Sequence, residues 1–301
     1  MRGDVLLGVG DDAAVMCVPP DRRLVAATDT IIEGVHFPHG AAAYDIGYRA
    51  LAVNLSDMAA MGAEPAWMTL SLGLPKVDAQ WLQDFSAGLY ELAERHNVAL
   101  VGGDTVRGEL SITVQIMGLV ETDKWLTRGG AQVGDAIFVS GSPGEAAAGL
   151  SAVLKDLPRS TALNRLRSRF WRPEPRVALG RAIRPFASAC IDVSDGVLAD
   201  LGHICERSGV GAHIDMETLP ISQSLREAFS RENCERFLLA GGDDYELLFT
   251  VPGHLLSAVK AAVADGAPCA AIGSIVAGNA PKCFRGGVEI KIEKRGFDHF
   301  V

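Results

Sequence analysis

The sequence predicts an α/β (α+β) protein of two domains, with mixed sheets flanked by helices. Apolar runs of strand length alternate with segments in which apolar residues recur at helical spacing. A polar, glycine-rich stretch at 127–135 divides the chain and suits a connection better than a core element. With 301 residues, 48% of them hydrophobic, the chain can build two ordinary domains. We expect these domains at residues 1–133 and 134–301.

The first half combines four strands with two helices. Gly62 ends the first helix and Pro65 follows it, while the second helix carries Leu82, Phe85 and Leu89 on one apolar face. The expected strands are 24–28, 67–74, 98–101 and 111–119, and the expected helices are 44–61 and 81–96. The strands at 24–28 and 98–101 are expected to deliver Thr28-Asp29-Thr30 and Gly102-Gly103-Asp104 at their ends.

The second half begins after the polar stretch. The expected strands are 136–140, 247–251 and 271–276, and the expected helices are 145–155, 176–186, 197–208 and 254–264. Residues 156–172 are basic and less regular. The turn Gly141-Ser-Pro-Gly144 precedes a helix, so its free N–H groups could hold an anion, or it could be an ordinary tight turn.

The helix at 44–61 carries a carboxylate in an apolar setting. Asn54 and Asp57 lie three residues apart and therefore share a helix face, which apolar residues such as Leu55 and Met58 surround. A carboxylate in such surroundings is costly unless it is paired, and no Lys or Arg lies between Ala50 and Lys76. A distant cation or a metal ion must therefore compensate Asp57.

Aspartates recur in similar positions along the chain. Several of them stand where a predicted strand ends, which is where ligands collect in α/β sheets. The recurring aspartates are Asp11, Asp12, Asp29, Asp104, Asp192 and Asp195. Oxygen ligands without a Cys/His cluster favour a hard cation, Mg²⁺ before Ca²⁺ or Zn²⁺. Independent structural roles for these aspartates are the alternative.

Composition narrows the functional class. The net charge of −9 and the pI near 5.3 argue against a nucleic-acid or anionic-membrane surface. The six cysteines are scattered without a Cys-x-x-Cys pair, which is typical of small hydrophobes in a reducing cytosol. No signal peptide and no apolar run of membrane-spanning length occurs, so a cytoplasmic location is expected.

The chemistry that remains is phosphoryl transfer. The chain has no Gly-Lys pair and hence no P-loop, and no His-x-x-x-His, Gly-x-Ser-x-Gly or dinucleotide fingerprint. Carboxylates and glycine turns spread over both halves can hold several Mg²⁺ ions around a polyphosphate. Transfer then proceeds by positioning and charge neutralisation.

Eight motifs occur in order along the chain: Gly10-Asp-Asp-Ala13, Thr28-Asp-Thr30, Gly34-Val-His-Phe37, Asn54-Leu-Ser-Asp57, Ala59-Ala-Met-Gly62, Gly102-Gly-Asp-Thr105, Asp192-Val-Ser-Asp-Gly196 and Gly241-Gly-Asp-Asp-Tyr-Glu246. Together they resemble the thiamine-monophosphate kinase family of the aminoimidazole-ribonucleotide-synthetase-like superfamily of ATP-using enzymes. The resemblance covers nearly the whole chain and ends with Gly296-Phe-Asp-His-Phe300. The family pattern has a helical segment before the first Gly-Asp-Asp, where about ten residues stand here.

The resemblance implies a fold, a reaction and a site. The fold is a two-domain aminoimidazole-ribonucleotide-synthetase-like architecture with the active site between the domains, the first of which binds ATP and metal and forms a homodimer through its sheet. The reaction is the Mg²⁺-assisted phosphorylation of thiamine monophosphate by ATP. The implied metal ligands are Asp12, Thr28, Asp29, Asp57, Asp104, Asp192 and Asp195, of which Asp57, Asp104 and Asp195 are catalytic. Gly103, Asp104, Arg128 and Ser194 would contact ATP, and His36, Glu246 and Phe297 would contact the substrate.

Two further expectations follow. Phe297 stands where Tyr or Trp is equally expected, so ring stacking is kept but a hydroxyl hydrogen bond is not. The alternating apolar residues Ile112, Val114 and Ile116 could form the intermolecular surface of the dimer. The alternatives are a sister ATP-using synthetase, for which no reactive Cys-Lys pair is evident near the N-terminus, and a non-catalytic nucleotide- or metal-binding protein.

Overall fold

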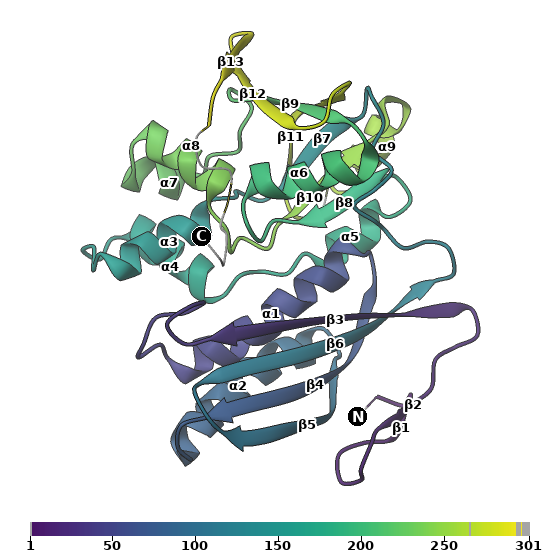
Figure 1. Cartoon of the computed structure of the whole chain (residues 1–301), viewed down its shortest axis with the longest axis vertical. Coiled ribbons are helices and arrows are strands. Elements are labelled where there is room, and N and C mark those ends of the chain that lie inside the picture. Colours follow the sequence, from purple (N-terminus) through teal and green to yellow (C-terminus); the bar gives the residue numbers. More distant parts are fainter. Residues whose placement is uncertain (1, 265, 293–295, 297–301) are drawn as a thin grey trace. The chain divides into compact units, whose positions relative to one another are not determined.

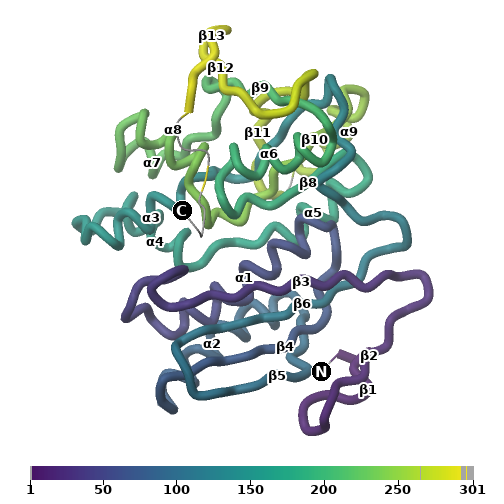
Figure 2. The backbone as a smooth tube through the Cα atoms, in the orientation of Figure 1, coloured from purple at the N-terminus to yellow at the C-terminus, as the bar shows by residue number. Residues whose placement is uncertain are grey.

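The computed structural model describes residues 2–264, 266–292 and 296. Two compact units are formed, one by the chain up to Met58 with Ala63–Trp125, the other by Ala59–Gly62 with the chain from Leu126 onward. The polar stretch 127–135 therefore belongs to the second unit. Figure 2 shows the path of the chain through both units.

The first unit contains a four-stranded sheet with helices on one face (Figure 1). The strand order is β3 (Arg22–Ile32), β6 (Ser111–Glu121), β4 (Glu64–Leu74) and β5 (Ala99–Arg107), and only the β4–β5 pair is parallel. The covering helices are α1 (Ala43–Ala60) and α2 (Ala79–Arg95). The helices touch at Gly47 and Gly88, where any side chain would overlap the backbone carbonyl groups of Phe85 and Tyr44.

The sheet of the first unit has one buried and one exposed face. Ile112, Val114 and Ile116 are fully buried on the face that carries the helices. The expectation that these three residues form an intermolecular surface is therefore wrong, because they build the core of their own unit. The opposite face carries the exposed side chains of Leu24 and Thr28.

A small hairpin, β1 (Val5–Leu7) and β2 (Val15–Met16), precedes this sheet. Val5 and Met16 pack against a cluster that contains Trp67. Two Arg2 nitrogens donate to the Asp4 carboxylate, the shorter bond being 2.7 Å, and Trp67 Nε1 donates to Asp4 Oδ1 at 3.1 Å. The hairpin is thus tied to the sheet by the hydrogen bond from Trp67 to Asp4 as well as by apolar packing.

The second unit is built on a seven-stranded sheet in the order β13-β12-β9-β11-β7-β10-β8. Its strands are β7 (Ala136–Ser140), β8 (Ala189–Asp192), β9 (Gly211–Asp215), β10 (Leu247–Val251), β11 (Cys269–Val276), β12 (Pro281–Arg285) and β13 (Val288–Ile290). Its helices are α3 (Glu145–Leu154), α4 (Thr161–Trp171), α5 (Val177–Ile183), α6 (Val197–Ser208), α7 (Gln223–Ala228), α8 (Arg231–Ala240), the 3₁₀ turn η1 (Gly253–Leu255) and α9 (Leu256–Ala262). The main core lies between this sheet and α6, where Leu201 and Ile204 meet Ile191 and Leu248.

Several expected elements differ from the structure. Residues 156–172 contain the regular helix α4, because Ser160 caps its first turn and Leu163, Leu166 and Phe170 recur on one buried face. The expected strands at 24–28 and 98–101 continue to Ile32 and Arg107. Thr28-Asp29-Thr30 and Gly102-Gly103-Asp104 therefore lie inside strands, not at strand ends.

The remaining differences concern short elements. The helix expected at 254–264 begins as η1 and continues as α9. Several short elements were not expected, because most of them span too few residues to show a periodic pattern of apolar residues. These elements are β9, α7, α8, β12 and β13. The expected helix at 44–61 and the strands at 136–140 and 247–251 are confirmed within a residue or two. In the described parts of the chain, no helix has the length and hydropathy needed to cross a membrane.

Candidate functional site

In the first unit, the carboxyl groups of Asp29 and Asp57 meet at the boundary between β3 and α1. Their side chains share a hydrogen bond, and burial raises the pKa of Asp29 despite that bond. Asn54, one helical turn before Asp57, accepts a hydrogen bond from the Asp29 N–H at 3.2 Å and donates to the Ala50 carbonyl at 3.0 Å. The helix thus holds both the backbone and the carboxyl group of Asp29. Asn54 and Asp57 share a helix face, as expected, and from that face both side chains contact Asp29.

The other two expected metal ligands of this sheet lie on its opposite face. Successive side chains of a strand alternate between faces, so Thr28 points away from the face on which Asp29 meets α1. Asp104 aligns with Ser71, Ser71 with Thr113, and Thr113 with Thr30, which places Asp104 on the exposed face with Thr28. Within this unit, the sheet therefore separates the side chains of Thr28 and Asp104 from the pair formed by Asp29 and Asp57.

Gly103 and His36 have specific backbone surroundings. Gly103 adopts a φ of 153°, and a Cβ there would overlap the Leu70 carbonyl, so only glycine fits between these strands. His36 follows β3, and its Nδ1 accepts a hydrogen bond from the Ile32 N–H at 3.1 Å. That bond leaves the proton of a neutral imidazole on Nε2, which is then a hydrogen-bond donor. Asp12 lies exposed in the hairpin loop, beside Asp11.

In the second unit, backbone hydrogen bonds join the two motifs that the sequence marks. The Asp243 N–H donates to the Ser194 carbonyl at 2.8 Å, the Tyr245 N–H donates to the Val193 carbonyl at 2.9 Å, and the Val193 N–H donates to the Glu246 carbonyl at 2.8 Å. Asp243 and Tyr245 both adopt positive φ values, 71° and 52°. Such strained non-glycine residues are concentrated at functional sites.

A buried carboxylate, Asp200, lies beneath the Asp192–Gly196 loop. Its Oδ2 accepts hydrogen bonds from the N–H groups of Ser194, Asp195 and Gly196, each at 3.1 Å. Burial raises its pKa to about 8, and the charges of Asp192 and Asp195 act in the same direction. Sequence reasoning missed Asp200, although its place four residues after Gly196, in the first helical turn, was a usable signal.

Glu246 is enclosed by two partners. Arg176 Nε donates to Glu246 Oε2 at 2.6 Å, Arg176 Nη2 donates to Oε1 at 2.5 Å, and Ser140 Oγ donates to Oε2 at 2.5 Å. Burial lowers the pKa of Arg176, but the hydrogen bond and charge of Glu246 outweigh it and the pKa is raised. Neither Arg176 nor Ser140 was singled out from the sequence.

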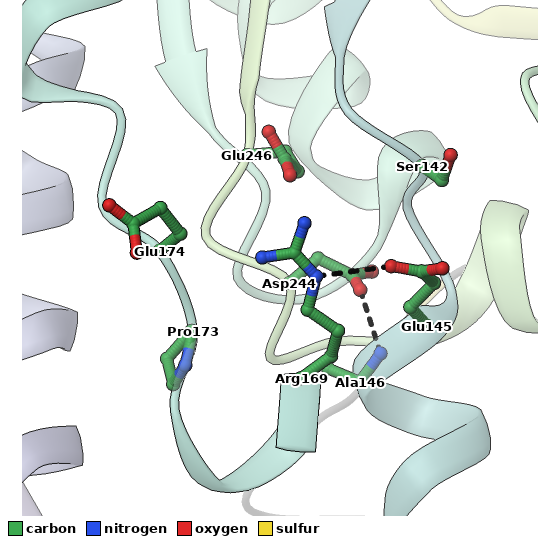
Figure 3. Close-up of a pocket in the computed structure, with 8 residues that line it drawn as sticks. All are labelled: Ser142, Glu145, Ala146, Arg169, Pro173, Glu174, Asp244 and Glu246. Atoms are coloured by element: carbon green, nitrogen blue, oxygen red, sulfur yellow. Dashed lines mark hydrogen bonds and ion pairs between the residues drawn. The ribbon is translucent and has the colours of Figure 1, made fainter. Parts of the chain in front are cut away.

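A small polar cavity lies beside Glu246 (Figure 3). It has a volume of about 10 Å³, room for roughly one water molecule. Asp244 lines it and accepts hydrogen bonds from the N–H groups of Gly144 at 2.6 Å and Ala146 at 3.0 Å. Burial raises the pKa of Asp244 even though these two bonds lower it. The sequence left open whether the glycine turn before α3 could hold an anion or is an ordinary tight turn. In the structure, its N–H groups hold a carboxylate of the same chain.

Of the expected nucleotide contacts, Arg128 and Ser194 lie at opposite ends of α6. Ser208, the last residue of α6, donates to the Arg128 carbonyl at 3.5 Å, whereas Ser194 precedes the first turn. The helix is 12 residues long, which corresponds to about 18 Å. A single nucleotide reaches both residues only if it extends along the helix or if the long Arg128 side chain turns toward it.

The expected metal ligands do not form a ready cluster. Within residues 2–264, 266–292 and 296, no group of three or more His, Cys, Asp or Glu side chains is arranged to hold a metal ion. Asp29 with Asp57, and Asp192 with Asp195, nevertheless supply the oxygen donors that hard cations prefer. Phe297 lies outside the described residues. Its neighbour Gly296 lies against Asp195 and Ala199, where a Cβ would come within 2.9 Å of the Asp195 carbonyl oxygen.

Comparison with known proteins identifies the family. The model of the AIR synthase related protein N-terminal domain matches residues 10–120, and that of the C-terminal domain matches residues 132–285. Thiamine-monophosphate kinase of Escherichia coli K12 is 45% identical over 304 aligned residues, covering 100% of this chain and 94% of the relative.

Solved structures agree with the sequence comparison. Thiamine-monophosphate kinase from Stenotrophomonas maltophilia K279a is 46% identical with a TM-score of 0.89, covering 95% of this chain and 92% of that one. AaThiL complexed with AMPPCP and TMP is 33% identical with a TM-score of 0.84, covering 97% and 92%.

The two domain matches and the α/β fold place the chain among the AIR synthase related proteins, as the eight motifs predicted. A sequence identity of 45% over the full chain shows a much closer relationship than a shared fold alone. The chain belongs to the thiamine-monophosphate kinase family.

Proposed function

We propose that the protein transfers the γ-phosphoryl group of ATP to thiamine monophosphate, giving thiamine diphosphate and ADP. The observation that carries this proposal is similarity to thiamine-monophosphate kinase along the whole chain. The related structure that binds AMPPCP and TMP, an ATP analogue and the acceptor, supports the same pair of substrates. The phosphate-handling motifs of both units fit this reaction.

Mg²⁺ is the metal that the donor set favours. Asp29 and Asp57 would hold it in the first unit, and Asp192 and Asp195 in the second. Asp29 and Asp57 share a hydrogen bond, and burial raises the pKa of Asp29, so a nearby cation would stabilise the ionised pair. When bound, Mg²⁺ offsets the negative charge of two polyanions that must approach each other. Thr28, Asp104 and Asp12 remain proposed ligands.

The residues of the site position the substrates and need not remove a proton. The acceptor is a phosphate whose second pKa is about 6, so its oxygen is already anionic at neutral pH. His36, with its proton on Nε2, can donate a hydrogen bond to that anion. Glu246, whose carboxylate Arg176 neutralises, is suited to accept a hydrogen bond from the substrate and not to act as a base. Gly103, Arg128, Ser194 and Asp104 are the proposed contacts of ATP, and Asp57, Asp104 and Asp195 the proposed catalytic residues.

We also propose a homodimer formed through the exposed face of the four-stranded sheet. That face carries Leu24, which is 51% exposed, together with Thr28 and Thr30. Light scattering at micromolar concentration should give twice the mass of the 31.8 kDa chain. Substitution of Leu24 by Glu should lower that mass, and a monomeric wild type would contradict the proposal.

The decisive assay follows product formation. Purified protein with ATP and Mg²⁺ should convert thiamine monophosphate to the diphosphate, with thiamine itself a poor acceptor because its hydroxyl must lose a proton. ADP release should be compared across a panel of phosphorylated acceptors. Preference for another acceptor would favour a sister synthetase or kinase. Nucleotide binding without turnover on any acceptor would favour a non-catalytic binding protein.

A further inference from the structure

Three successive backbone N–H groups of the Asp192–Gly196 loop converge on one oxygen atom. Asp200 Oδ2 accepts from Ser194, Asp195 and Gly196 at 3.1 Å each, and only 1% of Asp200 is exposed. Consecutive N–H groups that point to one place form a concavity of the kind that binds anions. Here the concavity holds a carboxylate from the same chain.

The other side of the loop is also fixed. The Ser194 carbonyl accepts from the Asp243 N–H, and the backbone of Val193 bonds with both Tyr245 and Glu246. Asp200 lies in the first turn of α6, and the next residue, Leu201, is fully buried in the core. The position of the Asp200 carboxylate is therefore set by a helix that cannot shift without disturbing the core.

We propose that Asp200 is a positioning residue for nucleotide binding. By holding the N–H groups of residues 194–196 inward, it orients the loop so that the half-buried side chains of Ser194 and Asp195 can meet the phosphates and their counter-ions. This inference rests on the proposed function, because it takes Ser194 and Asp195 as nucleotide and metal contacts. Asp200 itself touches neither substrate.

Hydrogen exchange tests the geometry directly. In the ligand-free wild type, the amides of residues 194–196 should exchange at least tenfold more slowly than unstructured amides, although all three residues precede α6. Exchange at the unstructured rate would overturn the proposal without any variant. Asp200→Ala should raise exchange at these amides at least tenfold, whereas Asp200→Asn, which keeps an acceptor oxygen, should give an intermediate rate.

Binding separates positioning from a structural role. Calorimetry with an unreactive ATP analogue and Mg²⁺ should show at least a tenfold rise in Kd for Asp200→Ala, with Kd for thiamine monophosphate within twofold of wild type. Ser160→Ala, which removes the cap of α4, is the matched control and should lower the melting temperature while leaving both Kd values unchanged. An unchanged nucleotide Kd in folded Asp200→Ala protein would refute the role of Asp200. A wild type that binds no nucleotide would instead contradict the proposed function.

Discussion

Arg176 and Glu246 form a two-bond ion pair across 70 residues of sequence, with nitrogen–oxygen distances of 2.5 and 2.6 Å. The side chains are 13% and 7% exposed, so both charges are largely removed from water. Bidentate geometry of this kind matches the planar guanidinium group and cannot be reproduced by lysine. The pair therefore fixes the orientation of a carboxylate that is proposed to contact the substrate.

Removing Arg176 alone should lower the free energy of unfolding more than removing both charges of the pair. Arg176→Met leaves a buried Glu246 without its cation and should cost roughly 3–5 kcal/mol of unfolding free energy. The double variant Arg176→Met with Glu246→Gln should recover part of that loss, because no charge is left unpaired. Chemical denaturation should be compared for the wild type, Arg176→Met, Glu246→Gln and the double variant. Strictly additive effects would contradict a coupled pair.

Gly141 should be required for the same carboxylate. It has a φ of 59°, and a Cβ there would overlap the carboxyl group of Glu246. Gly141→Ala should displace Glu246 and raise KM for thiamine monophosphate at least tenfold. Gly134 is the matched control, since its φ is 98° and no atom lies within 4 Å of a Cβ. Gly134→Ala should cost only backbone strain, about 1–2 kcal/mol, with KM unchanged. Equal KM values in the two variants would argue against a role for Glu246 in substrate binding.

Asp57→Asn should abolish most activity while sparing the fold. The substitution removes a charge beside the half-buried Asp29, so the ligand-free protein should melt at the same or a higher temperature. A neutral amide is also a poor Mg²⁺ ligand. Asp84→Asn, on the exposed side of α2, is the control for replacing a carboxylate by an amide. A loss of roughly 1–3 kcal/mol with normal turnover per folded molecule would indicate a structural carboxylate instead.

The Asp4 ion pair should give a defined dependence of stability on pH. Hydrogen bonds from Arg2 hold the pKa of Asp4 below its ordinary value of 3.8, although burial opposes them. A carboxyl group whose pKa is lower in the folded state contributes its full stabilisation above pH 3.8, and this is lost as the pH falls through the folded value. At neutral pH, the wild type should have a higher melting temperature than Asp4→Asn. This difference in melting temperature should disappear as the pH falls below 3.8. A gap that widens on acidification would be inconsistent with this linkage.

Thiol labelling should distinguish one cysteine from the rest. Among the described residues, Cys17 is the exposed cysteine. Burial raises the pKa of Cys205 and Cys269 to about 11, so few thiolates exist at neutral pH. Native protein at pH 7.5 should react rapidly at one thiol per chain, and Cys17→Ser should abolish that phase. Two or more fast thiols in the native protein would show that the buried cysteines are more accessible than the structure implies.

The sequence by itself determined the elements whose signals are local. Helix α1 follows from its apolar period and from Gly62, which stops it at a φ of 63°. The shared face of Asn54 and Asp57 follows from helical geometry alone. The ordered motifs determined the family, because their residue types and spacing are themselves the evidence.

Only the tertiary structure decided which groups meet. The glycine turn before α3 presents backbone N–H groups, and the fold satisfies two of them with Asp244. No local pattern distinguishes a turn that awaits an anion from one already occupied by a residue 100 positions away. Strand pairing likewise sent Asp29 toward α1 and Thr28 to the exposed face. Hydrogen-bond partners of buried polar groups are chosen by topology, since burial is a property of the packed chain and not of its segments.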